Sequence, residues 1–156
     1  MSDFSHLDES GAARMVDVSA KEVSARTATA TGFVRLSAEC VAALRAGNVP
    51  KGDALAVARI AGIQAAKRTP DLVPLCHPIA IHGVTVDLTV QDDGVVISAQ
   101  VRTADRTGVE MEALTCVSVA GLALIDMVKA VDPAAVITDV RVEEKTGGKT
   151  GLWRRP

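Results

Sequence analysis

The chain has 156 residues, 48% of them hydrophobic and 23% charged, which is typical of one globular domain with its own apolar core. A net charge of −2 offers no basic surface for a nucleic acid, and three cysteines without a CxxC spacing argue against a disulfide framework or a zinc site. We therefore expect a single domain, residues 1–156, in a reducing compartment such as the cytoplasm.

The first elements follow from alternation and from capping residues. Residues 1–20 are polar and aperiodic, and we expect them to form an N-terminal arm. Residues 25–36 alternate between small or apolar and mostly polar side chains, which predicts a strand. Ser37 then serves as the N-cap of a short helix that ends at Gly47.

The middle of the chain predicts a helix and a hairpin. Asp53 caps a helix that continues to about Arg68 and is rich in alanine, so another element is expected to pack closely against it. Residues 84–90 and 95–101 read as two strands, and the Asp-Asp-Gly turn at 92–94 joins them into a hairpin.

The last elements complete an α+β pattern. An apolar helix is predicted over about 109–131, where an Asp-Pro pair stops it, and a final strand over about 136–143. Residues 144–156 form a Gly- and Lys-rich loop and tail. This order predicts a ferredoxin-like β-α-β-β-α-β domain with an extra helix in the first crossover, in which an antiparallel sheet packs against helices.

The long apolar helix is also the nearest candidate for a membrane span, over residues 113–131. Asp126 and Lys129 interrupt its apolar character, and the N-terminus lacks the basic and apolar parts of a signal peptide. We therefore expect neither a membrane partner nor export.

Asp126 and Lys129 stand three residues apart and share one face of this helix. A carboxylate near a helix C-terminus opposes the helix dipole, so Asp126 does not stabilise the helix by its position. Two interpretations are open: a semi-buried ion pair, or a buried acid–base pair with perturbed pKa values.

Glu110, Met111 and Glu112 lie in the first turn of the same helix, where carboxylates either stabilise the dipole or contact a ligand. Glu112 and Asp126 point to the same side, but the helix separates them by about 21 Å at ~1.5 Å per residue. Either the ligand is long, or two subunits each contribute one end of the helix to a site.

Lysines at both ends of the second helix have two interpretations each. Lys51 precedes Gly52 and the cap Asp53, where free N–H groups favour anions, so it either binds a phosphate or is a solvated loop lysine. Lys67, in the last turn, contacts a ligand or merely complements the dipole.

The segment Leu75-Cys76-His77-Pro78 holds an imidazole in a rigid turn, because proline restricts the residue before it to extended geometry. Neighbouring side chains of an extended segment face apart, so a Cys76–His77 catalytic pair is not expected. A metal site built from Cys76, His77 and His82 is an alternative, and we favour ligand contact by His77.

The glycine-rich segment at 147–150 resembles the end of a P-loop, but the position of that loop's first glycine holds Glu143. We predict instead a flexible loop, carrying Lys145 and Lys149, that can close over an anion.

Taken together, seven segments resemble the cyclic pyranopterin monophosphate synthases of the MoaC family of molybdenum cofactor biosynthesis. They are jointly specific and run through nearly the whole chain in family order: M-V-D-V-S-A-K (15–21), K-G-D (51–53), A-R-I-A-G-I-Q-A-A-K-R-T (58–69), P-L-C-H-P (74–78), T-G-V-E-M-E-A-L-T (107–115), D-M-V-K-A-V (126–131) and G-G-K-T-G (147–151).

The resemblance implies a lyase that converts the GTP-derived (8S)-3′,8-cyclo-7,8-dihydroguanosine 5′-triphosphate to cyclic pyranopterin monophosphate and diphosphate. It also implies a homohexamer, a trimer of dimers, with sites at subunit interfaces, which would account for the distance between Glu112 and Asp126. It implies no certain cofactor and leaves a requirement for Mg²⁺ open.

Site roles carry over from the resemblance residue by residue. Asp126 matches the family's catalytic aspartate, and Lys51 and Lys129 match lysines that resemble acid–base and phosphate-positioning groups. Substrate contacts are implied for Leu75, Cys76, His77, Met111 and Glu112. The same pocket is expected to include Arg26, Lys67 and Glu110.

Two rival functions compete with the enzyme. A ferredoxin-like RNA-binding module would need stacking aromatic side chains and a basic surface, whereas this chain has three aromatic residues and a net charge of −2. A ligand-sensing regulatory domain could share the fold without catalytic residues, and it would not lose an activity when Asp126 or Lys129 is replaced.

Overall fold

The computed structural model describes residues 5–156, so the first four residues of the expected N-terminal arm lie outside the described residues. The expected order of elements is confirmed, with a short helix α3 and a short strand β5 in addition. The elements are β1 (Ser24–Arg35), α1 (Ala38–Ala46), α2 (Ala54–Lys67), α3 (Thr69–Leu72), β2 (Gly83–Gln91), β3 (Gly94–Asp105), α4 (Glu110–Val128), β4 (Val136–Thr146) and β5 (Trp153–Arg154).

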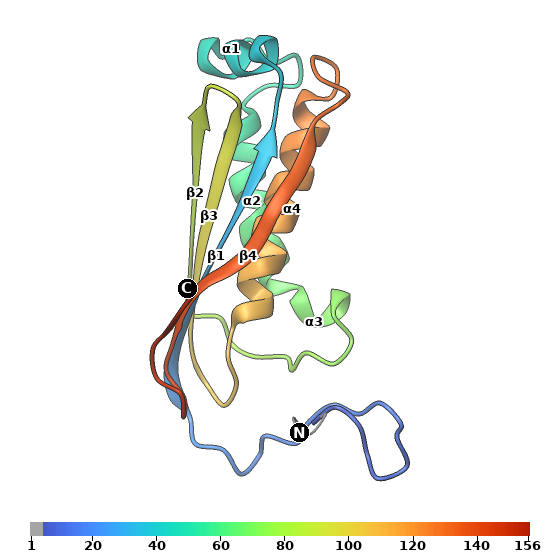
Figure 1. The fold of residues 1–156 in the computed structure, drawn as a ribbon, viewed down its shortest axis with the longest axis vertical. Helices are drawn as coiled ribbons and strands as arrows, with labels where there is room; N and C mark the ends of the chain where they lie inside the picture. Colours follow the sequence, from blue (N-terminus) through green and yellow to red (C-terminus); the bar gives the residue numbers. More distant parts are fainter. Residues whose placement is uncertain (1–4) are drawn as a thin grey trace.

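The strands form one sheet in the order β2-β3-β1-β4-β5, and every neighbouring pair is antiparallel. Each long crossover skips one strand position, so β1 lies between β3 and β4. The helices α2 and α4 lie on the same side of this sheet (Figure 1). This two-layer α+β arrangement confirms the ferredoxin-like fold class.

Capping side chains set the helix starts where the sequence predicts them. The Ser37 side chain accepts a hydrogen bond from the N–H of Cys40, and that of Asp53 accepts one from the N–H of Ala56. Gly47 ends α1 in the left-handed conformation at φ 72°.

Three element ends differ from the prediction by three or four residues, and strand pairing explains two of them. Strands β3 and β4 extend to Asp105 and Thr146 because both pair with β1 along its length. The helix α4 ends at Val128, because the N–H groups of Val131 and Asp132 both turn back to the carbonyl of Val128. Lys129 is therefore the C-cap of α4 and not an interior helical residue.

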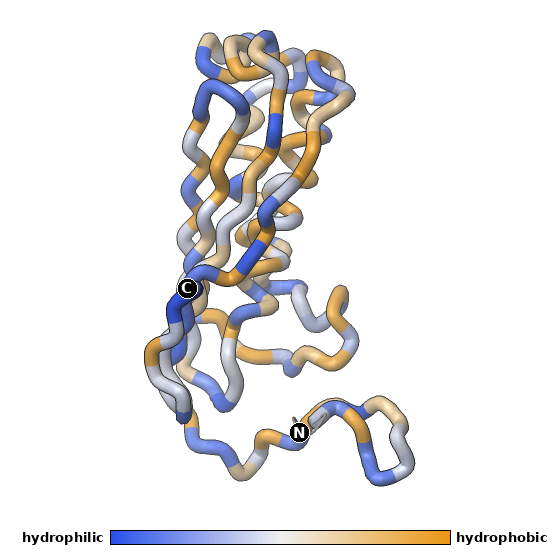
Figure 2. Tube along the Cα trace, in the orientation of Figure 1, coloured by the Kyte–Doolittle hydropathy of each residue, from blue (hydrophilic) through white to orange (hydrophobic). Residues whose placement is uncertain are grey.

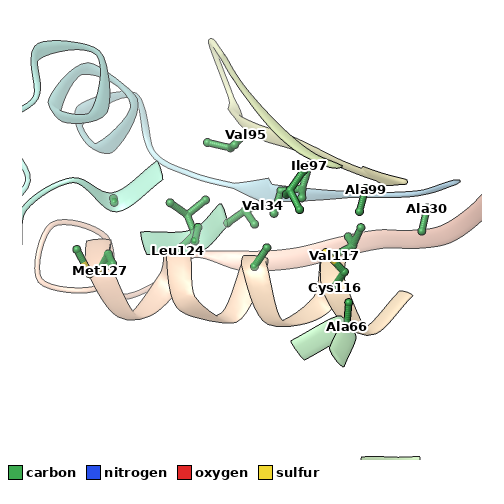
Figure 3. Close-up of a cluster of buried hydrophobic side chains, with 14 of the residues drawn as sticks. Ala30, Val34, Ala66, Val95, Ile97, Ala99, Cys116, Val117, Leu124 and Met127 are labelled. Carbon is green, nitrogen blue, oxygen red and sulfur yellow. The ribbon is translucent and has the colours of Figure 1, made fainter. Parts of the chain in front are cut away.

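The core lies between the sheet and α4. Along β1, Ala28, Ala30 and Val34 are fully buried toward the helices, which confirms the alternation read from the sequence. Figure 3 shows the buried side chains of Val117 and Leu124 on α4 directed toward the sheet. Hydropathy accordingly alternates along the central strands (Figure 2).

The second helix α2 packs closely on α4 through Gly62. A Cβ atom at Gly62 would lie 3.0 Å from the carbonyl oxygen of Cys116 and 3.1 Å from Cβ of Ala120. The two helices run in opposite directions, so the start of α2 lies beside the end of α4 (Figure 1). This packing confirms the expected close neighbour of the alanine-rich helix and positions the loop before α2.

The contacts of α4 explain why it is apolar on several sides. By length and composition it could cross a membrane, but 50% of its apolar stretch is buried inside the fold. One side of α4 packs on β1, β3 and β4, and another packs on α2. We therefore interpret α4 as a core helix.

Candidate active site

The upper end of α4 in Figure 1 carries a triad of charged side chains. Asp126 lies in the last turn of α4, Lys129 is the C-cap, and Lys51 comes from the loop before α2. Lys129 Nζ donates to Asp126 Oδ1 at 2.8 Å, and Lys51 Nζ lies 3.2 Å from both carboxylate oxygens. The fold thus brings together the three residues that the sequence suggested as catalytic.

This triad is open to solvent. The side chains of Lys51, Asp126 and Lys129 are 46%, 54% and 58% exposed, so the expectation of a buried or semi-buried pair is wrong for one chain. The physical reason is that Asp126 lies on the outer side of the last turn of α4, whereas Met127 and Val128 of the same turn are buried. Exposed ion pairs of this kind contribute little to stability, so the triad calls for another explanation.

The electrostatics of the triad favour an ionised carboxylate between two cations. Hydrogen bonds from Lys129 and then from Lys51 hold the pKa of Asp126 below its usual range. Asp126 therefore keeps two ammonium groups side by side, and together the three side chains carry one net positive charge. Such a surface can hold a phosphate and exchange protons with a group bound there.

The lower end of α4 borders a cavity of about 250 Å³. The N-terminal arm, the turn after α3 and the loop before α4 meet around it. Six of the residues that the sequence suggested for substrate contact line it: Leu75, Cys76, His77, Glu110, Met111 and Glu112. Two segments far apart in the sequence, 75–77 and 110–112, thus form one pocket.

Two carboxyl groups of this cavity have different surroundings. Glu112 is only 3% exposed, and its burial, followed by the charge of Glu110, raises its pKa. Glu110 is partly exposed, and one of its oxygens lies 3.5 Å from Nζ of Lys145 on β4. Glu112 can therefore keep its proton to a higher pH than an exposed glutamate, and a protonated carboxyl both donates and accepts hydrogen bonds.

Cys76 and His77 both line the cavity, and the expectation that their side chains face apart stays a prediction. The chain turns before them, where the N–H of Cys76 donates to the carbonyl of Val73 at 3.1 Å, and the segment is not extended at that point. Burial, followed by the charges of Glu112 and Glu110, raises the pKa of Cys76. Cys76 therefore lacks the thiolate character of an activated nucleophile.

Arg26 on β1 lies at the same end of the fold, beside the glycine loop. Its Nε donates to the carbonyl of Asp105 at 3.2 Å. Gly148 adopts a φ of +72°, a left-handed conformation that favours glycine, and its backbone lies beside the guanidinium of Arg26. The loop expected to carry Lys145 and Lys149 therefore packs against Arg26, and its Lys145 reaches Glu110.

Lys67 is exposed at the last position of α2, toward the lower end of α4, but it is not among the residues that line the cavity in the described chain. The lining also includes residues to which the sequence gave no role, among them Val16, Val18, Lys21 and Thr107. The signal that could have found them is the family resemblance, because residues 15–21 and 107–108 match the family although no predicted helix or strand contains them.

A metal site has no support in the described chain. Within residues 5–156, no three His, Cys, Asp or Glu side chains gather closely enough to hold a metal ion. The side chain of His77 is hydrogen-bonded to the carbonyl of Val16, and Nδ1 of His82 accepts from the N–H of Ala104 at 3.2 Å. The alternative of a site made from Cys76, His77 and His82 therefore has no supporting cluster within residues 5–156.

Comparison with known proteins decides the family. The sequence profile of the MoaC family matches residues 15–148 of the chain. This chain belongs to the MoaC family. The resemblance found in the sequence segments is thereby confirmed, and the MoaC match covers both the triad and most of the cavity.

Similar MoaC proteins carry a common name. A cyclic pyranopterin monophosphate synthase of Streptomyces avermitilis is 70% identical over 152 residues, which cover 97% of this chain and 89% of the relative. One of Nocardioides sp. is 68% identical over 98% of this chain and 96% of the relative. A cyclic pyranopterin monophosphate synthase 2 of Mycobacterium tuberculosis is 60% identical over 98% of this chain and 92% of the relative.

Proposed function

We propose that this chain is a lyase of molybdenum cofactor biosynthesis that forms cyclic pyranopterin monophosphate. Its substrate is (8S)-3′,8-cyclo-7,8-dihydroguanosine 5′-triphosphate, and diphosphate is the second product. The observation that carries the proposal is the identity of 70% to a synthase of that name over 97% of the chain. The Lys51–Asp126–Lys129 triad supplies the chemistry that such a reaction needs.

The triad is suited to the phosphate end of the substrate. Formation of a cyclic phosphate with loss of diphosphate gathers negative charge, which Lys51 and Lys129 stabilise. Asp126 is ionised, so it keeps both ammonium groups in place and can take part in proton transfer. Rebuilding the purine as a pterin requires several such transfers.

The cavity is suited to the base of the nucleotide. A buried carboxyl at Glu112 and the imidazole of His77 offer hydrogen bonds in a confined space of about 250 Å³. Arg26 and Lys145 lie beside this end and add positive charge near the glycine loop. Lys67, at the last position of α2, adds positive charge at the same end of the fold without lining the cavity in the described chain.

The active enzyme is a homohexamer, a trimer of dimers, in which the triad of one subunit faces the cavity of another. Support comes from the helix geometry, since Asp126 and Glu112 are separated by about 21 Å along α4. Apolar side chains on α2 and α4 are also exposed in one chain: Val57 by 42%, Ile60 by 66% and Leu122 by 60%. Exposed apolar clusters of this kind mark association surfaces.

The enzyme works in the cytoplasm. Its cysteines are free thiols at Cys40, Cys76 and Cys116, as suits a reducing compartment. The candidate span α4 is a core helix whose apolar sides face the sheet and α2. Neither a nucleic acid nor a membrane is a partner in this proposal.

Substitutions in the triad test the activity. Asp126→Asn and Lys129→Ala should each abolish turnover of the cyclised nucleotide, because each removes a charge that the reaction uses. The oligomer size, measured by light scattering, should not change. Asp92→Asn is the matched control, since Asp92 also forms an exposed ion pair, with Arg45 at 3.1 Å, and should retain full turnover. Near-normal turnover by both triad variants would contradict the proposal.

Subunit mixing tests the shared site. Inactive Asp126→Asn protein and inactive Glu112→Ala protein should regain partial turnover when their subunits are exchanged, because some mixed interfaces then combine an intact triad with an intact cavity. Exchange is verified by mass spectrometry of a labelled variant. Complete exchange without any recovered activity would show that both ends of α4 act within one subunit or in separate roles.

A further inference from the structure

The N-terminal arm is a folded loop that leads to the cavity. The carboxylate of Asp8 accepts from the N–H groups of Ser10 and Ala12 at 2.9 and 3.0 Å, and a strand bridge joins Leu7 to Ala13. These contacts close the loop on itself and direct the residues that follow it. The described part of the arm is therefore a folded loop that its own hydrogen bonds stabilise.

Residues 16–21, which we name the strap, form one wall of the cavity through Val16, Val18 and Lys21. Two hydrogen bonds attach the strap to the body of the domain. The imidazole Nε2 of His77 bonds to the carbonyl of Val16, and Nε of Arg106 donates to the carbonyl of Lys21 at 3.1 Å. The strap is thus fastened at both ends across the pocket.

Few apolar contacts hold the strap down. Met15 before it and Val23 after it are 49% and 55% exposed, and no strap residue belongs to the buried core. Segments held by a few polar contacts open at a small fraction of the free energy of global unfolding. The strap can therefore open for the ligand and close again while the sheet and helices stay folded.

The bond to Val16 determines which ring nitrogen of His77 carries the proton. A backbone carbonyl only accepts hydrogen bonds, so Nε2 of His77 must be the donor. In a neutral imidazole, Nδ1 is then the unprotonated nitrogen and a hydrogen-bond acceptor. Val16 thereby leaves His77 with an acceptor for whatever occupies the cavity.

We propose that the strap is a closing element of the nucleotide site and that the carbonyl of Val16 is a positioning group for His77. It fixes the Nε2–H tautomer, so that Nδ1 accepts a hydrogen bond from an N–H or O–H group of the bound nucleotide. This inference rests on the proposed function for the identity of the ligand. The tautomer and the attachment of the strap are properties of the free protein.

The tautomer is measured directly on the unliganded protein. The chain has three histidines, so ¹⁵N-histidine labelling with long-range ¹H–¹⁵N spectra resolves His77 after assignment with a His77→Gln sample. We expect a protonated Nε2 and an unprotonated Nδ1. A protonated Nδ1 in the neutral ring would overturn the proposal.

Two substitutions of His77 distinguish the roles of its two ring nitrogens. The longer side-chain amide of the His77→Gln variant reaches the place of Nε2 and can donate to Val16, whereas the shorter amide of the His77→Asn variant reaches only the place of Nδ1. Hydrogen–deuterium exchange of residues 16–21 should match the parent protein in His77→Gln and be about tenfold faster in His77→Asn, as expected for a lost hydrogen bond. Equal exchange rates of residues 16–21 in both variants would overturn the proposal that His77 attaches the strap.

Removal of the arm loop together with the first three strap residues tests the role of the strap in the reaction. Deletion of residues 2–18 should raise KM about tenfold with little change in kcat, and His77 should then populate both tautomers. The control is Glu9→Ala, a substitution at an exposed position of the preceding loop that keeps the Asp8 hydrogen bonds, so KM and tautomer should not change. An unchanged KM and a single tautomer after deletion would overturn the inference. Absence of turnover in the parent protein would contradict the proposed function instead.

Discussion

At the upper end of α4 a carboxylate stands between two lysines in solvent, whereas at the lower end a carboxyl group is enclosed by the arm, the turn after α3 and the helix itself. The pKa of Asp126 is lowered because Lys129 and Lys51 donate hydrogen bonds to it, and the pKa of Glu112 is raised because burial disfavours its charged form. The same helix therefore offers one carboxyl group whose charged form is favoured and another whose charged form is disfavoured.

Each end of α4 suits a different part of the proposed nucleotide, and in the proposed hexamer the two ends that meet in one site come from different subunits. Charged phosphates need cations that remain ionised, and a purine-derived base needs hydrogen bonds in a confined space. The helix keeps the two environments apart, so the carboxyl groups do not perturb each other. Substitutions at the triad, in the core between the two ends of α4 and at the enclosed Glu112 should therefore have separate effects.

The largest effect is expected at Lys51. Lys51→Arg keeps the positive charge beside Asp126, but a guanidinium does not release a proton near neutral pH. If Lys51 acts in proton transfer, turnover should fall by about 100-fold or more while the fold is retained. Turnover is measured with the cyclised nucleotide, and the fold by circular dichroism.

Arg45→Lys is the matched control for this experiment, because Arg45 forms an exposed ion pair with Asp92 away from the triad. It should leave turnover unchanged. Retention of at least about a third of the turnover in Lys51→Arg would restrict Lys51 to holding phosphate by its charge.

A smaller effect, on stability, is expected in the middle of α4. Val117 is fully buried against the sheet, so Val117→Ala should lower the free energy of unfolding by about 2 kcal/mol through lost apolar burial and a small cavity. Val136→Ala is the control, since Val136 is 50% exposed and should change stability by less than about 0.5 kcal/mol. Urea unfolding measures both, and equal losses would mean that α4 is not held by this core.

The smallest effect is a change in pH dependence at Glu112. Because its pKa is higher in the folded protein than in the unfolded chain, the folded state binds more protons between the two values. Stability should therefore fall as pH rises through that window, by at most about 1.4 kcal/mol per pH unit. Glu112→Gln should remove this decrease in the free energy of unfolding with pH. The variant should therefore be more stable than the parent at neutral pH.

Urea midpoints between about pH 5 and pH 8 measure the effect of Glu112→Gln on the pH dependence. The exposed arm residue Glu9 provides the control, since Glu9→Gln should leave the pH dependence as in the parent. A midpoint of Glu112→Gln that follows the parent at every pH would show that burial does not favour the neutral form of Glu112.

The sequence predicted most of the fold because its signals are local. Ser37 and Asp53 cap helices by hydrogen bonds to residues three positions away, and alternation along 25–36 places Ala28 and Val34 in the core. The short helix α3 was missed because Pro70 reads as a helix stop, although proline also suits a first helical turn. The ends of β3 and β4 were missed because pairing with β1 extends them.

For the site, local spacing predicted the pairing of Asp126 with Lys129, since residues three apart on a helix are neighbours. The third member, Lys51, was suggested by its helix start and by the family resemblance, and its distance of 3.2 Å from Asp126 follows from the packing of α2 on α4. The exposure of the triad could not be read from the apolar sequence around it, because α4 ends there.

What the sequence determined by itself is the order of the long helices and strands, the apolar faces and the family, since each depends on residue order and on short-range hydrogen bonds. The tertiary structure decided which side chains meet. It enclosed Glu112, left Asp126 in solvent and laid the strap across the cavity with the carbonyl of Val16 on His77. These outcomes depend on desolvation and on contacts between distant segments, which arise only when the helices pack on the sheet.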